Sequence, residues 1–85
     1  MEFEWDQKKH LKNLRERGIG FDDAALALEE IIDIWEDRRR NYGEPRLIAR
    51  CRYEGDMLIV VYTDRGDVRR IISARRANKR ERRGL

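Results

Sequence analysis

Hydrophobic and polar residues alternate along five short stretches of the chain, as they do in β-strands that bury one face. The stretches that we predict as strands are residues 2–5, 31–36, 46–53, 57–63 and 68–76. Residues 57–63 are apolar on both faces, which predicts the central strand of a sheet. In the last stretch, strict alternation places Ile71 and Arg75 on one face and Ala74 and Arg76 on the other.

Helical signals occur at two places near the N-terminus. Asp6 is a suitable N-cap for a helix that runs to Arg17, and Gly18 is a typical stop. A second helix is predicted by apolar residues spaced i, i+3, i+4 and i+7, namely Phe21, Ala24, Ala25 and Leu28. We expect this helix to end near Glu30.

A short helix is also predicted at the C-terminus, beginning near Lys79. Asn78 is a suitable N-cap, and Glu81 follows three residues later, where its side chain can bond back to the cap. The predicted order is therefore a strand, two helices, four strands and a last helix. This order indicates one α+β domain over residues 1–85, with the two N-terminal helices on one face of a small, twisted, mainly antiparallel sheet.

Charge is unevenly distributed along the chain. Charged residues make up 44% of the 85 positions, and the net charge is +3. Residues 75–85 hold six basic side chains and one acidic side chain, whereas residues 1–74 hold fourteen basic and sixteen acidic ones. The chain is thus a mildly acidic body with a basic C-terminal end.

Residue types that are scarce in the chain exclude several kinds of site. Cys51 is the single cysteine, so no internal disulfide forms, and no run of about 18 apolar residues or signal-like segment occurs. We expect a cytoplasmic protein that does not enter a membrane. One His and one Cys do not make a conventional zinc site, and neither a Gly-rich phosphate loop nor a Ser-His-Asp set is present. We therefore expect no cofactor and no metal.

Arginine is the residue type left to carry chemistry. Guanidinium groups bind phosphate through paired hydrogen bonds and stay charged at physiological pH. Arg46 and Arg50 lie on one side of a predicted strand, and the run Arg38–Arg40 lies in a polar loop as either a solvated turn or a phosphate clamp. We expect the guanidinium groups of separate strands, including Arg75 and Arg76, to converge around one anion-sized hollow beside the last strand.

An arginine cluster of this kind supports two mechanisms on RNA. It can bind phosphates only, with an affinity that depends on salt. Alternatively, it can stabilise the negative charge that develops when a 2′-hydroxyl attacks the neighbouring phosphate, without a metal. The second mechanism needs proton transfer, for which the crowded Lys8, Lys9 and Lys12 are candidates because neighbouring positive charge favours the neutral amine.

Residues near both ends of the chain carry a resemblance to a known family. They are Phe3-Glu4-Trp5-Asp6, Lys9, Asn13, Leu14, Gly18, Phe21, Ile72-Ser73-Ala74-Arg75-Arg76-Ala77 and Lys79-Arg80-Glu81-Arg82. With these residues the chain resembles the BrnT toxins of type II toxin–antitoxin systems over essentially its whole length. It differs from the usual family pattern at Arg17, where a histidine is common, and at Arg50-Cys51, where an Ile-Gly pair is usual.

The resemblance implies a fold like that of the RelE ribonucleases and RNA cleavage that halts translation. It also implies neutralisation by a BrnA-type antitoxin, through which the complex binds operator DNA. The catalytic positions that it implies are Lys9, Arg46, Arg75 and Arg76. We expect RNA contacts from Arg50, Lys79 and Arg80 as well, and an assembly that is either a homodimer or a toxin–antitoxin heterotetramer.

Two other functions stay open at the level of the sequence. The same arginines could belong to a non-catalytic module that binds RNA or DNA without turnover, or they could dock an acidic segment of a protein such as an antitoxin. Cleavage of RNA in EDTA by the folded protein separates the ribonuclease from both alternatives.

Overall fold

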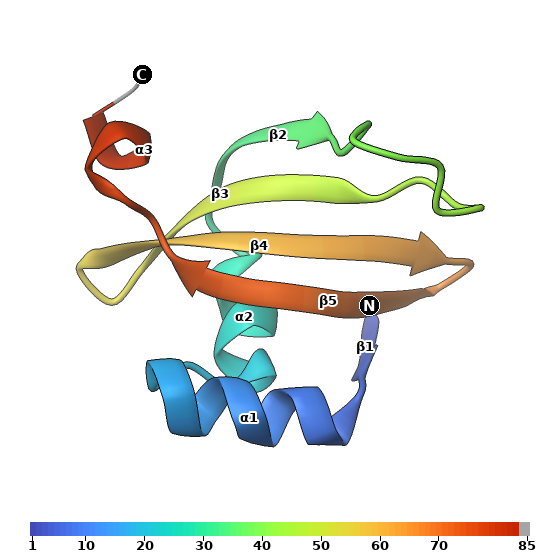
Figure 1. Ribbon diagram of the computed structural model, residues 1–85, viewed down its shortest axis with the longest axis horizontal. Coiled ribbons are helices and arrows are strands. Elements are labelled where there is room, and N and C mark those ends of the chain that lie inside the picture. Colours follow the sequence, from blue (N-terminus) through green and yellow to red (C-terminus); the bar gives the residue numbers. More distant parts are fainter. Residues whose placement is uncertain (84–85) are drawn as a thin grey trace.

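One five-stranded sheet organises residues 1–83, the part of the chain that the computed structural model describes (Figure 1). The elements are β1 (Glu2–Trp5), α1 (Gln7–Arg17), α2 (Phe21–Ala27), β2 (Ile31–Glu36), β3 (Leu47–Tyr53), β4 (Asp56–Arg65), β5 (Val68–Arg76) and α3 (Lys79–Arg83). The strand order is β1-β5-β4-β3-β2, with β1 parallel to β5 and the other pairs antiparallel. The predicted α+β class is confirmed, and the predicted strands agree with these bounds to within two residues.

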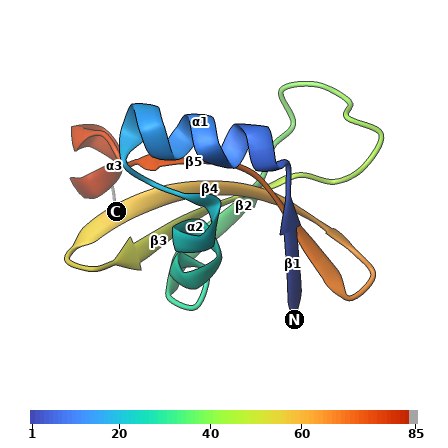
Figure 2. The ribbon, with the colours of Figure 1, turned by 90° about the horizontal axis from the view of Figure 1, so that it is seen from below.

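The sheet has one covered face and one open face. Helix α2 lies on one side of it, with α1 along the β5 edge (Figure 2), and buried residues of α2 pack there against Ala49, Val60 and Ala74. We call this side the helix face. Ile48 precedes Ala49 in β3, so its side chain points to the other side of the sheet, which we call the open face. Trp35 pairs with Ile48 across antiparallel strands and therefore also lies on the open face.

A β-bulge at Ile72 changes the alternation in β5. Val61 pairs with Ser73, whereas the next residue, Tyr62, pairs with Ile71, so Ile72 is an extra residue. Ile71 and Ala74 consequently both face the core, and both are buried. The prediction of strict alternation was wrong here, because the bulge shifts the phase of every residue that follows it.

Helix α1 is attached mainly by polar contacts. It has no buried residue, and Leu11 and Leu14, the two leucines of its apolar side, are about half exposed. Apolar packing therefore does not hold the helix in place. Because β1 pairs only with the first half of β5, the second half has a free edge, and α1 lies along it (Figure 2). Asn13 Nδ2 donates to the carbonyls of Ile19 (2.8 Å) and Ala74 (3.0 Å), which joins the helix to that edge.

The ends of the helices follow the predicted signals with one exception. The Asp6 carboxylate accepts hydrogen bonds from two N–H groups of the first turn of α1, and Gly18 ends the helix with φ 71°. Helix α2 ends at Ala27, three residues before the predicted end at Glu30. Its last turn tightens, since the N–H groups of residues 29 and 30 bond to carbonyls three residues earlier, and Ala27 is buried where the prediction had Ala25.

No helix within residues 1–83 is long and apolar enough to cross a membrane. Cys51, the single cysteine, is fully buried, and burial raises the pKa of its thiol to about 11. Cys51 is therefore a small residue of the core.

We predict that Asn13→Ala lowers the free energy of unfolding by about 1–2 kcal/mol, because two carbonyls lose a donor. Urea denaturation measures the change. Lys12→Ala is the matched control, since Lys12 is an exposed residue of the same helix. An equal effect of the two substitutions would contradict the proposed attachment of α1.

Candidate functional site

Arg75 and Glu81 form a two-point ion pair on the open face. Arg75 Nη1 lies 2.7 Å from Glu81 Oε1, and Nη2 lies 2.8 Å from Oε2, so the guanidinium group holds both carboxylate oxygens. The Arg75 side chain remains 42% exposed and that of Glu81 24% exposed. The hydrogen bonds from Arg75 lower the pKa of Glu81 to about 2. Arg75 is therefore an anion-binding group whose ligand is a carboxylate of the same chain.

Arg50 lies beneath this pair and is almost fully buried. Its Nε donates to Asp33 Oδ1 (3.0 Å) on β2, and its Nη1 donates to the backbone carbonyl of Glu81 (2.7 Å). With 4% of the residue exposed, Arg50 joins β2 to α3 and does not face solvent. The prediction of Arg50 as an RNA contact is wrong for this arrangement, because α3 covers the side chain.

Arg76 points away from Arg75, to the helix face. Its partner across the strands is Leu58, a core residue, whereas Arg75 pairs with Ile59 on the open face. Arg76 Nη1 donates to the carbonyl of Arg17 (2.6 Å) at the end of α1. Arg76 thus caps a helix, and the prediction that it shares one phosphate with Arg75 is wrong.

Arg46 lies on the open face, but at the opposite end from Arg75. Arg46 precedes Leu47, which pairs with Tyr62, so Arg46 lies level with Thr63 of β4. Arg75 pairs with Ile59 of the same strand. This offset of four residues along the strands corresponds to about 13 Å. The predicted convergence of Arg46 with Arg75 on a single anion-sized hollow is therefore wrong, because the strand register separates the two guanidinium groups.

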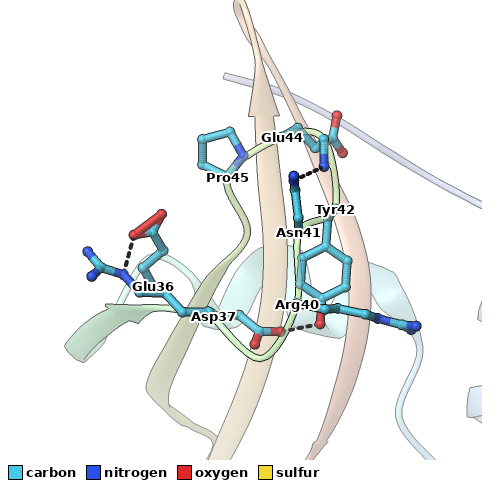
Figure 3. A pocket seen from close by; sticks show the side chains of 9 residues that line it. Glu36, Asp37, Arg40, Asn41, Tyr42, Glu44 and Pro45 are labelled. Carbon is cyan, nitrogen blue, oxygen red and sulfur yellow. Dashed lines mark hydrogen bonds and ion pairs between the residues drawn. The ribbon is translucent and has the colours of Figure 1, made fainter.

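The loop between β2 and β3 packs against Arg46, which stays partly exposed. The Arg46 guanidinium lies over the ring of Tyr42, 4.0 Å from its centre, and Arg40 lies 5.4 Å from the same centre. The Tyr42 hydroxyl donates to the buried carboxylate of Asp37 (3.1 Å), which holds the ring in place (Figure 3). Asp37, Arg40 and Tyr42 border a hollow of about 480 Å³ within the loop.

Arg39 lies in the same loop and forms a two-point ion pair with Asp37. Asp37 accepts hydrogen bonds from Arg39 Nε and Nη2, both at 2.9 Å, and these bonds hold the pKa of Asp37 far below its usual value. The Glu81 carboxylate raises the pKa of Arg75, and the positive charge of Arg39 opposes that shift. Arg39 and Arg75 are thus each paired with a carboxylate of the same chain, Asp37 and Glu81 respectively. The sequence alone did not decide whether Arg38–Arg40 form a solvated turn or a phosphate clamp.

Lys9 lies at the edge of β5. It borders a hollow of about 250 Å³ whose lining includes Lys12, Ile72 and Ser73. Ser73 precedes Arg75 by two residues on the same face of the strand. The structure therefore places Lys9 across the β5 edge from the Arg75 end of the site.

The other predicted cations and the histidine lie elsewhere. Lys79 and Arg80 are exposed on α3. His10 Nδ1 accepts the Phe21 N–H (2.9 Å), so the imidazole joins α1 to α2 and does not reach the open face. Residues 1–83 contain no group of three or more His, Cys, Asp or Glu side chains placed to bind one metal ion.

A comparison with family models now identifies the kind of protein. The model described as ribonuclease toxin, BrnT, of type II toxin-antitoxin system matches residues 5–81 of the 85. The chain belongs to this BrnT family of ribonuclease toxins. A search of curated proteins found no match.

Membership of the BrnT family implies RNA as the substrate and an antitoxin protein as a partner. The resemblance noted in the sequence is confirmed. The matched segment runs from Trp5 to Glu81 and so includes the open face with both members of the Arg75–Glu81 pair.

We predict that Glu81 titrates with a pKa near 2, against 4.5 for a free glutamate side chain. Because the folded-state pKa is the lower one, the pair stabilises the protein above about pH 4.5, and this contribution is lost as the pH falls toward 2. NMR of the side-chain carboxyl carbons measures the midpoint. Arg75→Gln should return it toward 4.5, and a midpoint near 4.5 in the unsubstituted protein would show that the pair does not form.

Proposed function

We propose that the protein is an endoribonuclease that cleaves RNA on its open face, with Arg75 binding the phosphate at the cleaved bond. The observation that carries this proposal is the two-point contact between Arg75 and the Glu81 carboxylate. A phosphate presents pairs of oxygens to a guanidinium group in the same way. In this proposal the RNA phosphate takes the place of Glu81.

The reaction that suits this site is internal transfer of the phosphoryl group. The 2′-oxygen forms a bond to phosphorus, the bond from phosphorus to the 5′-oxygen breaks, and a 2′,3′-cyclic phosphate remains on one product. The 2′-hydroxyl gives up a proton, and the leaving 5′-oxygen takes one. Arg75 stabilises the additional negative charge on the phosphorane, which is electrostatic catalysis that needs no metal.

Lys9 is the proposed group for proton transfer. It borders the hollow that contains Ser73, on the strand that carries Arg75. From this position on α1, Lys9 approaches the site across the edge of β5. Its assignment rests on this placement and on the family resemblance.

The remaining cations divide into two groups. Arg39, Lys79 and Arg80 are exposed and contact neighbouring phosphates, which adds affinity without choosing a sequence. Arg46, about 13 Å along the strands from Arg75, binds a more distant part of the RNA together with Tyr42.

The antitoxin in this proposal is of the BrnA type and inhibits the toxin by covering the open face. Operator DNA is then bound through the antitoxin. The family description supports an antitoxin partner, and the exposed part of the Arg75 side chain supports the surface that it covers.

We predict that the purified protein cleaves RNA in EDTA, with 2′,3′-cyclic phosphate or 3′-phosphate ends. Arg75→Ala should reduce cleavage by about a hundredfold or more, the usual cost of removing a group that stabilises a developing anion. Arg15→Ala is the matched control, because it removes the same charge from an exposed position on α1.

Two results would contradict the ribonuclease proposal. One is the absence of cleavage by a folded preparation that still binds RNA, which would favour a binding module. The other is full activity of Arg75→Ala.

A further inference from the structure

A second hollow on the open face has walls of mixed chemistry. It measures about 370 Å³ and lies beside β2, where Trp35, Ile48 and Arg39 line it together with Glu36, Asp37 and Arg38. Trp35 and Ile48 are paired across β2 and β3, so both side chains rise from the open face. Trp35 is 44% exposed, which is a large area for an aromatic side chain of a small domain to leave in water.

The lining suits a nucleotide better than an apolar partner. The indole presents a flat π-face on which any base can stack. The adjacent arginines can contact phosphate, and the exposed Glu36 carboxylate, which accepts from Arg38 (2.8 Å), can accept from a base amino group. The buried centre of a protein–protein interface is normally depleted of charge, whereas most residues around this hollow are charged.

The sheet register places this hollow near the phosphate site. Arg39 lines the hollow, and Trp35 pairs with Ile48, which lies level with Ser73, two residues before Arg75. Strands β2 and β5 are separated by β3 and β4, so Trp35 lies about 14 Å from the strand that carries Arg75. A base in the hollow would therefore belong to a nucleotide that flanks the cleaved phosphate.

We propose that the hollow at Trp35 binds one nucleobase of single-stranded RNA beside the cleavage point. The proposal rests on the proposed function, since it assumes that RNA lies on the open face. Stacking on Trp35 holds the strand in the direction that brings the next phosphates to Arg39 and Arg75. The base adds affinity that does not depend on charge, so it aligns the RNA even where salt weakens the phosphate contacts.

The test uses RNA that binds but is not cleaved. A 2′-O-methyl oligonucleotide lacks the attacking hydroxyl, and an abasic oligonucleotide of the same length keeps its phosphates but has no bases. Trp35→Leu should weaken binding of the 2′-O-methyl oligonucleotide by roughly fivefold to a hundredfold, the usual effect of losing one stacked base. The same substitution should leave binding of the abasic oligonucleotide unchanged. Trp35→Phe should keep most of the affinity because it retains an aromatic face.

Fluorescence gives an independent readout. In a Trp5→Phe background, Trp35 is the remaining tryptophan, and the base-bearing oligonucleotide should quench it while the abasic one should not. Ile34→Ala is the control, since Ile34 is an exposed apolar residue of the same strand on the other face of the sheet.

Each alternative outcome overturns the proposal in a recognisable way. Unchanged binding by Trp35→Leu, with a loss on Arg75→Ala, would remove the base site but keep the phosphate site. Equal weakening of both oligonucleotides would show a change of fold or charge. A loss of antitoxin binding alone would assign Trp35 to a protein interface. If Arg75→Ala also has no effect, the proposed function itself fails.

Discussion

The ion pair between Arg75 and Glu81 is the interaction on which both the C-terminal fold and the proposed chemistry depend. Helix α3 has the sequence Lys-Arg-Glu-Arg-Arg and contains no buried residue, so apolar packing does not hold it. Its contacts are ionic and polar: Glu81 binds Arg75 and caps the helix through Asn78, and its carbonyl accepts from Arg50. Contacts of this type can be exchanged for a phosphate. In the proposed function, an RNA phosphate displaces this carboxylate from Arg75.

A single extra residue in β5 determines which arginine faces this site. The bulge at Ile72 keeps Ile71 and Ala74 in the core and turns Arg75 to the open face, next to α3. Arg76 then faces α1, where its guanidinium group satisfies the carbonyl of Arg17 at the helix end. Two adjacent and chemically identical side chains thus have separate tasks, one in binding an anion and one in attaching a helix.

The sequence predicted the order of elements well because each one has a local cause. Asp6, Gly18 and the Asn78–Glu81 pair mark helix ends through hydrogen bonds within one turn. The site was predicted less well because it depends on register and coverage. Consecutive apolar residues hide the bulge at Ile72, and nothing local shows that α3 covers Arg50. Arg39 was left undecided, although Asp37 two residues earlier was a signal for an ordered loop.

The most direct measurement of the central claim is the affinity of Glu81→Gln for a 2′-O-methyl oligoribonucleotide. Glutamine can still accept the Asn78 N–H that caps α3, but it no longer neutralises Arg75. Glu29→Gln provides the same change of charge at an exposed position. If Glu81 occupies the phosphate site, Glu81→Gln binds the RNA up to about fivefold more tightly than Glu29→Gln, as expected for a partly exposed ion pair. Equal or weaker binding by Glu81→Gln would contradict the account.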